Sequence, residues 1–423
     1  MQIWIVEIAE PLPAIDGTVR DLRCGMLAKM LSAKGHDVLW WTSTFCHHKK
    51  AHRFNESRSI DIQPGLCLRL LHGPGYRRNV SLQRIKHNRV VADAFAKEAE
   101  LHSTAPDLIF ACVPALEVCE KAVEDAQRRG IPIIVDARDQ WPDHYLTVFP
   151  LPARRWAKWL LRSEFRRARR IFQRATGITA MANPMLEWGL GYACRPKRST
   201  DGVFPIGYSA PGYSPGEIEE KASDLKSSHA IRTDNLVFTY IGQFGSACDL
   251  RTVIQSAKLL EQSGSANIQI VLAGSGYYES KLRKMARGLQ NVVFTGWLNE
   301  LEMVGLLSLS DVGLVTHAKR ASYFMGNKPF QYMAAGLPLI SSTRGDLEAL
   351  IRDEKIGLSY KAENSSSLLE AIRWFITHEE ESKAMGKRSR QLIDERFSVE
   401  IVYHELIEHM QGIVSSSRKR YEP

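Results

Sequence analysis

Short apolar runs alternate with helical repeats through most of the 423-residue chain, and this alternation constrains the fold more than any other feature. Residues 3–8 form an apolar, β-rich run, residues 22–31 carry Leu and Met at helical spacing, and a second β-rich run occupies residues 38–42. A strand, a helix and a second strand in this order form a βαβ unit of a parallel sheet. The pattern therefore predicts an α/β protein with doubly wound, Rossmann-like sheets.

The same alternation continues in both halves of the chain. In the first half we expect strands at 107–112, 133–136 and 177–182 and helices at 82–101 and 115–129. In the second half we expect strands at 236–241, 268–273, 292–294, 312–315, 339–341 and 357–360, with helices at 250–262, 281–289, 301–308, 346–351 and 365–377. Gly, Pro and Ser are enriched at 202–215, which is typical of a linker. We predict an N-terminal domain at 1–205, a linker at 206–232, a C-terminal domain at 233–397, a final helix at 398–415 that crosses back to the first domain, and a ligand cleft between the domains.

Composition narrows the class of protein. Hydrophobic residues make up 44% and charged residues 24%, which is typical of a globular protein. No apolar run approaches the roughly 20 residues that span a bilayer, and no basic, cleavable leader follows Met1. The net charge of +9 favours anionic partners such as phosphates or anionic lipid. These features predict a cytoplasmic protein.

The cysteines and histidines do not indicate a metal site. Seven cysteines, an odd number without paired spacing, favour reduced thiols. One group of possible ligands contains Cys46, His47, His48 and His52. These residues lack the spacing of a closed zinc site, so we expect no metal.

Residues 322–342, SYFMGNKPFQYMAAGLPLISS, have the pattern of a phosphate-binding turn. Pro329 suits the first turn of a helix, because its φ is already helical and its missing N–H needs no partner there. The start of this helix offers free N–H groups and a positive dipole, with Gly326, Asn327 and Lys328 beside it. Such a turn attracts phosphate. An ordinary αβ turn in a parallel sheet is the alternative.

Glycine-containing loops follow the first strand of each half. Gly242, Gln243 and Gly245 lie between the strand and the helix that open the second half, where backbone N–H groups can cradle phosphate. Gly17 lies in the loop after the first strand of the chain, at the edge where open α/β sheets bind ligands. A plain turn glycine is the alternative there. No G-x-G-x-x-G follows that strand, so an NAD-type site is not indicated.

Arg138 and Asp139 follow the strand at 133–136, in the loop ARDQWPDHY. Loops at the carboxyl edge of a doubly wound sheet often carry functional residues. We therefore predict a functional role for both residues, with a surface Arg–Asp pair as the alternative.

Residues 153–174, ARRWAKWLLRSEFRRARRIFQR, have the most unusual composition in the chain. Wound as one helix at about 100° per residue, they separate an apolar, aromatic half from a basic half. The residues that we expect at a membrane surface are Trp156, Trp159, Arg162, Arg166 and Arg169. A basic amphipathic helix with tryptophans is typical of an element that faces anionic lipid. A core-packed helix with a solvated face is the alternative. We expect no nucleic-acid binding, because no recognised motif accompanies the helix.

Four segments of the second half carry a family resemblance. They are YIGQFGSACDL from Tyr240, LAGSGYYESKL from Leu272, VVFTGWLNELEMVGLLSLSDVGLV from Val292 and NKPFQYMAAGLPLISS from Asn327. In this order they resemble the retaining nucleotide-sugar glycosyltransferases of family 4, whose two Rossmann-like domains have the GT-B arrangement. The loop DARDQWP is similar to one in the branch that builds bacterial surface polysaccharides. The resemblance implies a nucleotide diphosphate sugar as donor and no cofactor or metal. It also implies that the nucleobase of the donor lies near Gly274 and Trp297.

The chain departs from this family's pattern in its expected donor site. Family members often have an acid-x7-acid pair where this chain has Tyr323 and Gln331. Many also have an Arg and a Lys where this chain has Gln243 and Cys248. The resemblance then implies that the diphosphate rests on backbone N–H groups of Gly245 and the 326–329 turn, with Lys328, and Lys319 or Arg320 as further candidates, as counter-charge. It also implies that Gln331 meets the ribose as a neutral amide.

These features together predict a membrane-peripheral glycosyltransferase at the inner face of the cytoplasmic membrane. It would move a sugar, with retention, from a nucleotide diphosphate to a lipid-linked saccharide in surface-polysaccharide synthesis. Arg138, which replaces a frequent acceptor-side His of the family, would orient the acceptor with Asp139. Lys328 would meet the charge on the leaving group. Two alternatives stay open: a sugar-nucleotide epimerase, and a non-catalytic paralogue that binds a donor or a partner enzyme.

Overall fold

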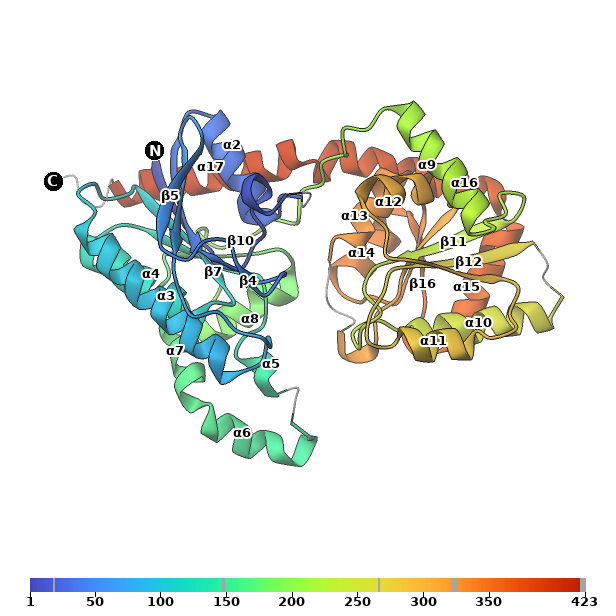
Figure 1. The fold of residues 1–423 in the computed structure, drawn as a ribbon, viewed down its shortest axis with the longest axis horizontal. Coiled ribbons are helices and arrows are strands. Elements are labelled where there is room, and N and C mark those ends of the chain that lie inside the picture. Colours follow the sequence, from blue (N-terminus) through green and yellow to red (C-terminus); the bar gives the residue numbers. More distant parts are fainter. Residues whose placement is uncertain (18–19, 147–148, 265–266, 322–325, 419–423) are drawn as a thin grey trace. The chain divides into compact units, whose positions relative to one another are not determined.

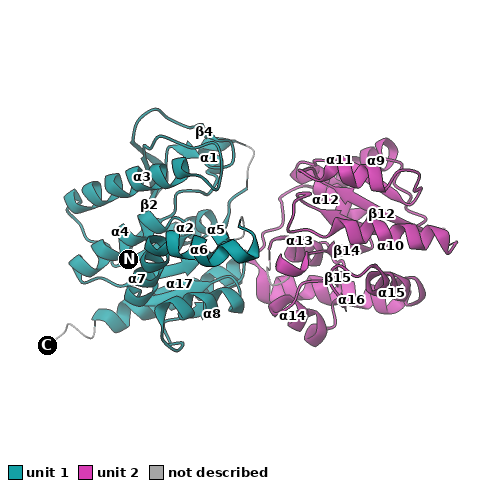
Figure 2. Ribbon diagram, turned by 90° about the horizontal axis from the view of Figure 1, so that it is seen from below, with its two compact units in different colours: residues 1–207, 399–423 teal, residues 208–398 magenta. Residues whose placement is uncertain are grey.

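The computed structural model of this chain describes residues 1–17, 20–146, 149–264, 267–321 and 326–418. It divides into two compact units, each with its own sheet (Figure 1, Figure 2). Unit 1 contains residues 1–207 and 399–423, and unit 2 contains residues 208–398. In sequence, unit 2 therefore interrupts unit 1.

Within the described residues, eight strands form the sheet of unit 1. In spatial order they are β10 (Gly202–Val203), β9 (Gly177–Ala180), β8 (Ile133–Ala137), β7 (Leu108–Val113), β1 (Gln2–Val6), β2 (Asp37–Ser43), β6 (Leu66–Leu71) and β5 (Arg58–Gln63). Neighbouring strands are parallel, except that β5 is antiparallel to β6. A separate antiparallel ribbon pairs β3 (Phe45–Cys46) with β4 (Ala51–His52). Strand β7, LIFACV, is buried along its whole length, as expected for a strand covered on both faces.

Helices cover both faces of this sheet. One face packs against α3 (Leu82–Leu101), α4 (Leu116–Arg129), α7 (Arg162–Arg174) and α8 (Asn183–Ala193), and the other against α2 (Arg23–Ala33) and α17 (Val399–Arg418). Leu406 and Met410 of α17 lie in the same buried core as Leu27 and Leu31 of α2. Short helices α1 (Pro13–Asp16), α5 (Asp143–Leu146) and α6 (Arg154–Leu160) lie in the connections.

The sheet of unit 2 is parallel throughout its described residues. Its spatial order is β13 (Val292–Gly296), β12 (Ile268–Ala273), β11 (Leu236–Ile241), β14 (Val312–Val315), β15 (Leu339–Ser341) and β16 (Gly357–Ser359). One core contains side chains of α10 (Leu250–Gln262), α11 (Glu279–Met285), α15 (Ser365–Thr377) and α16 (Glu379–Leu392), and a second core contains those of α9 (Pro215–Ser228) and α12 (Glu300–Ser308). Helices α13 (Lys328–Ala334) and α14 (Asp346–Glu354) follow β14 and β15. The predicted class, two doubly wound Rossmann-like domains, is confirmed; the predicted cleft between them stays a prediction.

The predicted linker at 206–232 was wrong in part, because it contains helix α9. Ser214 and Glu217 form a capping box, in which the Ser214 hydroxyl accepts the Glu217 N–H at 3.3 Å and the Glu217 carboxylate accepts the Ser214 N–H at 2.8 Å. This reciprocal pair satisfies two N–H groups that the start of a helix otherwise leaves without partners. Helix α9 packs against α12 and belongs to unit 2.

The single helix predicted at 153–174 was also wrong, because it is divided into α6 and α7 at Leu161. This residue has φ −90° and ψ 13°, outside helical geometry. The break has a packing reason. Helix α7 buries Ala168, Ile171 and Phe172 in the unit 1 core, whereas Ala157 alone is buried in α6. Because of the break, α6 runs in a different direction from α7, and α7 keeps the direction in which it packs against the sheet (Figure 1).

The strand order reverses once beside the first strand of each unit. In unit 1, β1 lies between β2 and β7, and in unit 2, β11 lies between β12 and β14. Ligands of open α/β sheets bind beyond the carboxyl ends of the strands at such a switch point. The loops after β1, β11 and β14 are therefore the positions that the fold favours for a site.

Candidate functional site

Three loops are joined by backbone hydrogen bonds at the carboxyl edge of the unit 2 sheet. The Gly242 N–H donates to the Ala273 carbonyl at 2.9 Å. The Gly274 N–H donates to the Gly296 carbonyl at 2.7 Å. Gly242 and Gly274 have φ of 142° and 139°, and a Cβ on Gly274 would collide with the Gly242 carbonyl. Glycine is required at these positions, so the backbone itself forms the surface at this edge.

Lys328, the first residue of α13, lies against this glycine loop. A Cβ on Gly242 would collide with its side chain, and its ammonium lies 5.0 Å from the centre of the Tyr240 ring. Among the described residues, no carboxylate forms an ion pair with this ammonium. Burial lowers the pKa of Lys328. A half-buried cation that lacks a counter-ion has lost part of its hydration, and an anionic ligand would supply the missing partner.

Helix α13 is tied to the same loop. The buried Tyr332 hydroxyl accepts the Ile241 N–H at 2.8 Å, at the end of β11. Asn327 precedes the helix but provides no side-chain cap to its first N–H groups. Gln331 lies one turn from Lys328 and is 8% exposed, and its amide Nε2 meets Met303 Sδ, a weak acceptor, at 3.3 Å. The predicted residues of α13 and the predicted glycine loop are thus brought together.

His317 is a residue of this site that the sequence pattern did not reveal. It follows β14, its backbone N–H donates to the Ser342 hydroxyl at 2.7 Å, and its Nδ1 lies 2.9 Å from Thr343 Oγ1. Burial, and then the charge of Lys328, lower the pKa of His317 to about 4. The imidazole is therefore neutral at pH 7. Its position after a strand at the switch point was the one signal available in the sequence.

The other predicted donor residues have different surroundings. Trp297 directly follows β13 and is 72% exposed. Gln243 is exposed, and its carbonyl accepts the Tyr240 hydroxyl at 3.1 Å. Gly245 and Gly326 lie in the loops before α10 and α13, and Tyr323 lies outside the described residues. The roles predicted for these residues stay predictions.

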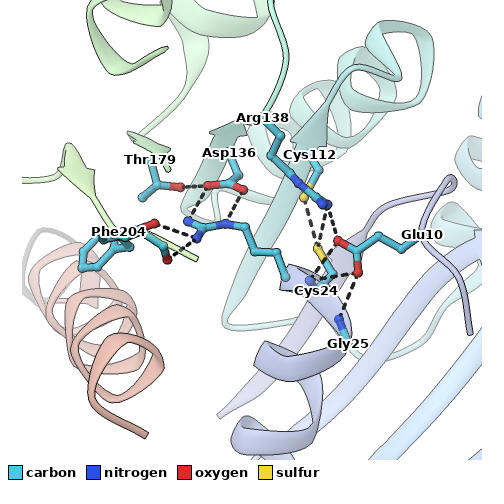
Figure 3. Close-up of polar contacts among 10 residues, drawn as sticks. Glu10, Cys24, Gly25, Cys112, Asp136, Arg138, Thr179 and Phe204 are labelled. Atoms are coloured by element: carbon cyan, nitrogen blue, oxygen red, sulfur yellow. Dashed lines mark hydrogen bonds and ion pairs between the residues drawn. The ribbon is translucent and has the colours of Figure 1, made fainter. Parts of the chain in front are cut away.

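Arg138 belongs to a polar cluster at the carboxyl edge of the unit 1 sheet (Figure 3). Its guanidinium pairs with the Glu10 carboxylate and lies 3.7 Å from Cys24 Sγ. Glu10 also accepts the Cys24 N–H at 3.0 Å, and the Cys24 and Cys112 sulfur atoms are 3.3 Å apart. The Arg138 side chain is 15% exposed. Glu10 therefore already meets much of the charge that we expected Arg138 to offer an acceptor, and that role stays a prediction.

A second buried ion pair in Figure 3 fixes the end of β8. Asp136 accepts Arg23 Nε–H at 2.8 Å and Arg23 Nη2–H at 3.0 Å, with neither side chain exposed by more than 1%. The Thr179 hydroxyl donates to Asp136 at 2.7 Å, and Arg23 Nη1–H donates to the Phe204 carbonyl at 2.7 Å. Because every charged atom of the pair has a partner, this pair holds β8, β9 and α2 together.

Asp139 forms the more open polar group at this edge. Its carboxylate accepts Trp141 Nε1–H at 2.8 Å and lies 2.7 Å from His144 Nδ1. Burial would raise the pKa of Asp139, but contact with His144 lowers it. The hydrogen bond to Asp139 in turn raises the pKa of His144. Both side chains are about two-fifths exposed, at 39% and 43%, so this pair is accessible to a ligand of unit 1.

The loop after β1 contains a buried carboxyl group that the sequence analysis did not single out. Glu7 accepts the Ala9 N–H at 2.9 Å and the Glu10 N–H at 2.8 Å. Burial, and then the nearby Glu10, raise the pKa of Glu7 to about 7.

Gly17 ends α1 with φ 85°, and a Cβ there would meet nothing within 4 Å, so backbone conformation rather than crowding favours glycine.

The group at 46–52 contains no arrangement for a metal. Within the described parts of the chain, His, Cys, Asp and Glu side chains form no group of three that could hold an ion. His47 contacts the Tyr76 hydroxyl, and burial followed by the charge of Lys50 lowers the pKa of His47 to about 3. His52 stacks on His72 at 4.9 Å between ring centres.

The basic segment 153–174 has two different parts. In α7, Arg167 and Arg170 pair with Glu120 of α4 and fix the helix to the unit. In α6, Trp156 is 76% exposed and Trp159 is 61% exposed, with the Arg162 guanidinium 4.9 Å from the Trp159 ring centre. The core-packed alternative therefore describes α7 but not α6. None of the described helices is both long enough and apolar enough to cross a membrane.

The two Rossmann-like units define the class of fold. The solved structure of the Anabaena protein HepE in complex with UDP matches the chain with a TM-score of 0.68 at 14% identity, covering 97% of this chain and 100% of that one. The fold is that of the GT-B glycosyltransferases, as predicted.

The match of residues 222–392 to the family model "Glycosyl transferases group 1" identifies the domain that contains the Lys328 site. O-antigen chain mannosyltransferase C of Escherichia coli is 31% identical over 145 residues, which are 34% of this chain and 39% of that protein. The GDP-mannose-dependent monoacylated alpha-(1-6)-phosphatidylinositol monomannoside mannosyltransferase of Corynebacterium glutamicum is 25% identical over 221 residues, covering 49% and 55%. The chain thus carries a Glycosyl transferases group 1 domain, and its alignments span about half or less of these relatives.

Proposed function

We propose that this chain is a retaining glycosyltransferase that moves a sugar from a nucleoside diphosphate sugar to a lipid-linked saccharide in surface-polysaccharide synthesis. The half-buried side chain of Lys328, whose ammonium has no carboxylate partner among the described residues, carries the proposal. It lies against the Gly242 loop at the switch point of unit 2, inside the matched domain. A diphosphate supplies the negative charge that this ammonium lacks.

The remaining residues of the site suit the other parts of a nucleotide sugar. Gly245 carries no side chain, and a Cβ there would meet nothing closer than 3.9 Å, so a phosphate can approach its backbone N–H group. The Gln331 amide has one weak sulfur contact, so it can exchange that contact for a ribose hydroxyl. Trp297, exposed after β13, offers a ring on which a base can stack. The relative HepE has been solved with UDP, and the Corynebacterium glutamicum relative is named as GDP-mannose-dependent.

In the proposed reaction, the bond between the anomeric carbon and the diphosphate oxygen breaks while the acceptor oxygen bonds to that carbon from the same face. The leaving diphosphate gains negative charge, and Lys328 stabilises it by an electrostatic contact that grows as the bond breaks. The acceptor proton passes to the leaving phosphate oxygen, so no protein base is needed, and attack from the same face requires no protein nucleophile. The neutral His317 can donate a hydrogen bond without adding charge. No metal or other cofactor takes part.

Unit 1 supplies the proposed acceptor groups. Asp139 and His144 form an accessible hydrogen-bonding pair that suits saccharide hydroxyls. Helix α6 suits the lipid part, because exposed Trp156 and Trp159 can enter the interface between lipid headgroups and acyl chains. Basic residues near an anionic leaflet contribute about 1 kcal/mol each. We therefore place the enzyme on the inner face of the cytoplasmic membrane.

One observation favours a second candidate function. Gln331 and Gln243 are neutral at positions where the resembling family often carries charge. A chain that binds the donor without transferring its sugar would have the same Lys328 site. The two functions differ in turnover, so a single set of assays separates them.

The test incubates the purified full chain with a panel of UDP- and GDP-sugars and measures nucleoside diphosphate release, with and without vesicles that carry a lipid-linked saccharide. The proposed enzyme should release the nucleotide from one donor, faster with acceptor, and its product should keep the donor's anomeric configuration by NMR. Donor binding without release supports the non-catalytic candidate. Conversion of the donor's sugar without release indicates an epimerase. A chain that binds none of these donors contradicts the proposal.

A further inference from the structure

Unit 2 contains a cavity of about 510 Å³ between α10 and α11. Its lining comes from the loop before α10, from the facing sides of the two helices, and from Arg320 and Glu363. Gly242, Lys328 and Gln331 do not line it. The cavity therefore shares Gly245 with the site proposed for the donor, but not the cation Lys328 of that site.

Three cationic side chains from three different segments converge on this cavity. Arg251 comes from α10, Lys281 from α11, and Arg320 from the segment after β14. Arg320 donates to the Ser246 carbonyl at 2.9 Å, which holds its guanidinium at the rim. Arg251 and Lys281 have no hydrogen-bond or ion-pair partner among the described residues. Two of the three charges are thus available to a ligand.

The carboxylates in the lining are already engaged. Asp249 accepts the Thr252 N–H at 3.3 Å with one oxygen and the Glu363 N–H at 2.9 Å with the other. The Glu363 carboxylate accepts the Lys319 N–H at 3.1 Å and lies 3.6 Å from the Lys319 ammonium. Neither acid forms an ion pair with Arg251 or Lys281, and the three cations outnumber the two carboxylates, so the lining keeps a small excess of positive charge.

The rest of the wall suits a ring or another apolar group. Tyr278, Leu282 and Met285 of the α11 segment face Leu250 of α10 across the cavity lining. The volume lies within the range of about 300–1,000 Å³ that small-molecule sites occupy. Glu363 has φ 59°, a left-handed conformation that is strained for a residue other than glycine and tends to occur at ligand sites.

We propose that this cavity is a binding site for a small phosphorylated metabolite, distinct from the donor site. The phosphate contacts Arg251, Lys281 and Arg320, and the ring or apolar part lies on Tyr278 and Met285. The binding itself does not depend on whether the chain transfers sugars.

The test measures binding of glucose 6-phosphate and of inorganic phosphate to the full chain by calorimetry. The double variant Arg251→Glu/Lys281→Glu removes the charge. The matched control is Lys258→Glu/Lys284→Glu, which makes the same charge change on the same two helices at exposed positions outside the lining. We expect the first variant to lose more than about tenfold in affinity, since charge-assisted bonds are lost. The control should stay within about twofold of the wild type, because distant surface charges are screened.

A third variant separates this site from the donor site. Lys328→Met should leave glucose 6-phosphate affinity unchanged, since Lys328 lies outside the cavity lining. If Arg251→Glu/Lys281→Glu does not fold, Arg251→Gln/Lys281→Gln replaces it, with Lys258→Gln/Lys284→Gln as its control. Three results overturn the proposal: no binding of either probe to the wild type at millimolar concentration, equal losses in the paired variants, or loss of glucose 6-phosphate binding in Lys328→Met. A failed donor assay with intact glucose 6-phosphate binding would contradict the transferase proposal alone.

Discussion

Lys328→Met separates the charge of this side chain from its packing. Methionine keeps an apolar stem against Gly242 and the Tyr240 ring but removes the ammonium. Burial lowers the pKa of Lys328, and no carboxylate among the described residues pairs with it. Removing a half-buried charge that lacks a counter-ion does not destabilise a fold. We therefore expect the free energy of unfolding of the ligand-free variant to equal or exceed that of the wild type.

Nucleotide binding should change in the opposite direction. A hydrogen bond to a charged group contributes about 1.5–3 kcal/mol, which corresponds to roughly 10- to 150-fold in Kd. We expect UDP or GDP, whichever binds the wild type, to bind Lys328→Met that much more weakly. The matching nucleoside has no phosphate, so its affinity should not change.

Calorimetry with the diphosphate and the nucleoside, together with urea unfolding of each variant, measures both effects. Lys258→Met, at an exposed position of α10, is the control for loss of one positive charge in unit 2. Unchanged diphosphate affinity in Lys328→Met would refute the placement of the diphosphate. Equal losses for diphosphate and nucleoside would mean that the substitution distorts the site. Marked destabilisation of the ligand-free variant would show that the ammonium already has a partner in the protein.

The remaining predictions concern the ribose, the membrane and pH. Gln331→Glu should keep donor affinity by calorimetry, whereas Gln331→Leu should lose it by about 1 kcal/mol or more with little loss of stability; a Leu variant with normal affinity would remove Gln331 from the ribose. Trp156→Ser/Trp159→Ser should reduce flotation with anionic vesicles while nucleotide binding stays intact, because both rings are exposed and unit 2 is untouched; retained vesicle binding would count against α6 as the membrane element. Burial raises the pKa of Glu7 from 4.5 to about 7. Protonation of Glu7 therefore stabilises the folded state by about 3 kcal/mol below pH 4.5, and this contribution is lost as the pH rises through 7. Glu7→Gln does not titrate, so its stability relative to the wild type should increase between pH 5 and pH 8 in urea unfolding; a difference that does not vary with pH would contradict the buried carboxyl.

Much of the fold could be predicted because its central strands are apolar on both faces. The strand at 236–241, the helix at 250–262 and the strand at 312–315 have the bounds that the sequence indicated. Strand β5 was not predicted, because RSIDIQ lies at the sheet edge and alternates without an apolar run. Helix α16 was also missed, since EEESKAMGKRSRQL carries few apolar residues and depends on its packing in unit 2.

The candidate site was predictable where a residue type reports a local backbone requirement. Gly242 and Gly274 are such residues, because their backbone angles exclude other side chains. The neutral state of His317 depends on burial and on Lys328, which a sequence pattern does not place nearby. The pairing of Arg138 with Glu10 joins residues that are far apart in sequence, so only the folded chain reveals it.

The position of α17 has a consequence for the order in which the chain acquires its structure during synthesis. Its apolar side chains complete the core around Leu27 and Leu31 of α2, yet it is translated after all of unit 2. Unit 2 is continuous in sequence, so it can finish folding while unit 1 still exposes the apolar groove that Leu406 and Met410 will fill. Unit 1 therefore exposes part of its apolar core while unit 2 is being synthesised. During this interval the chain is most prone to aggregate or to bind chaperones.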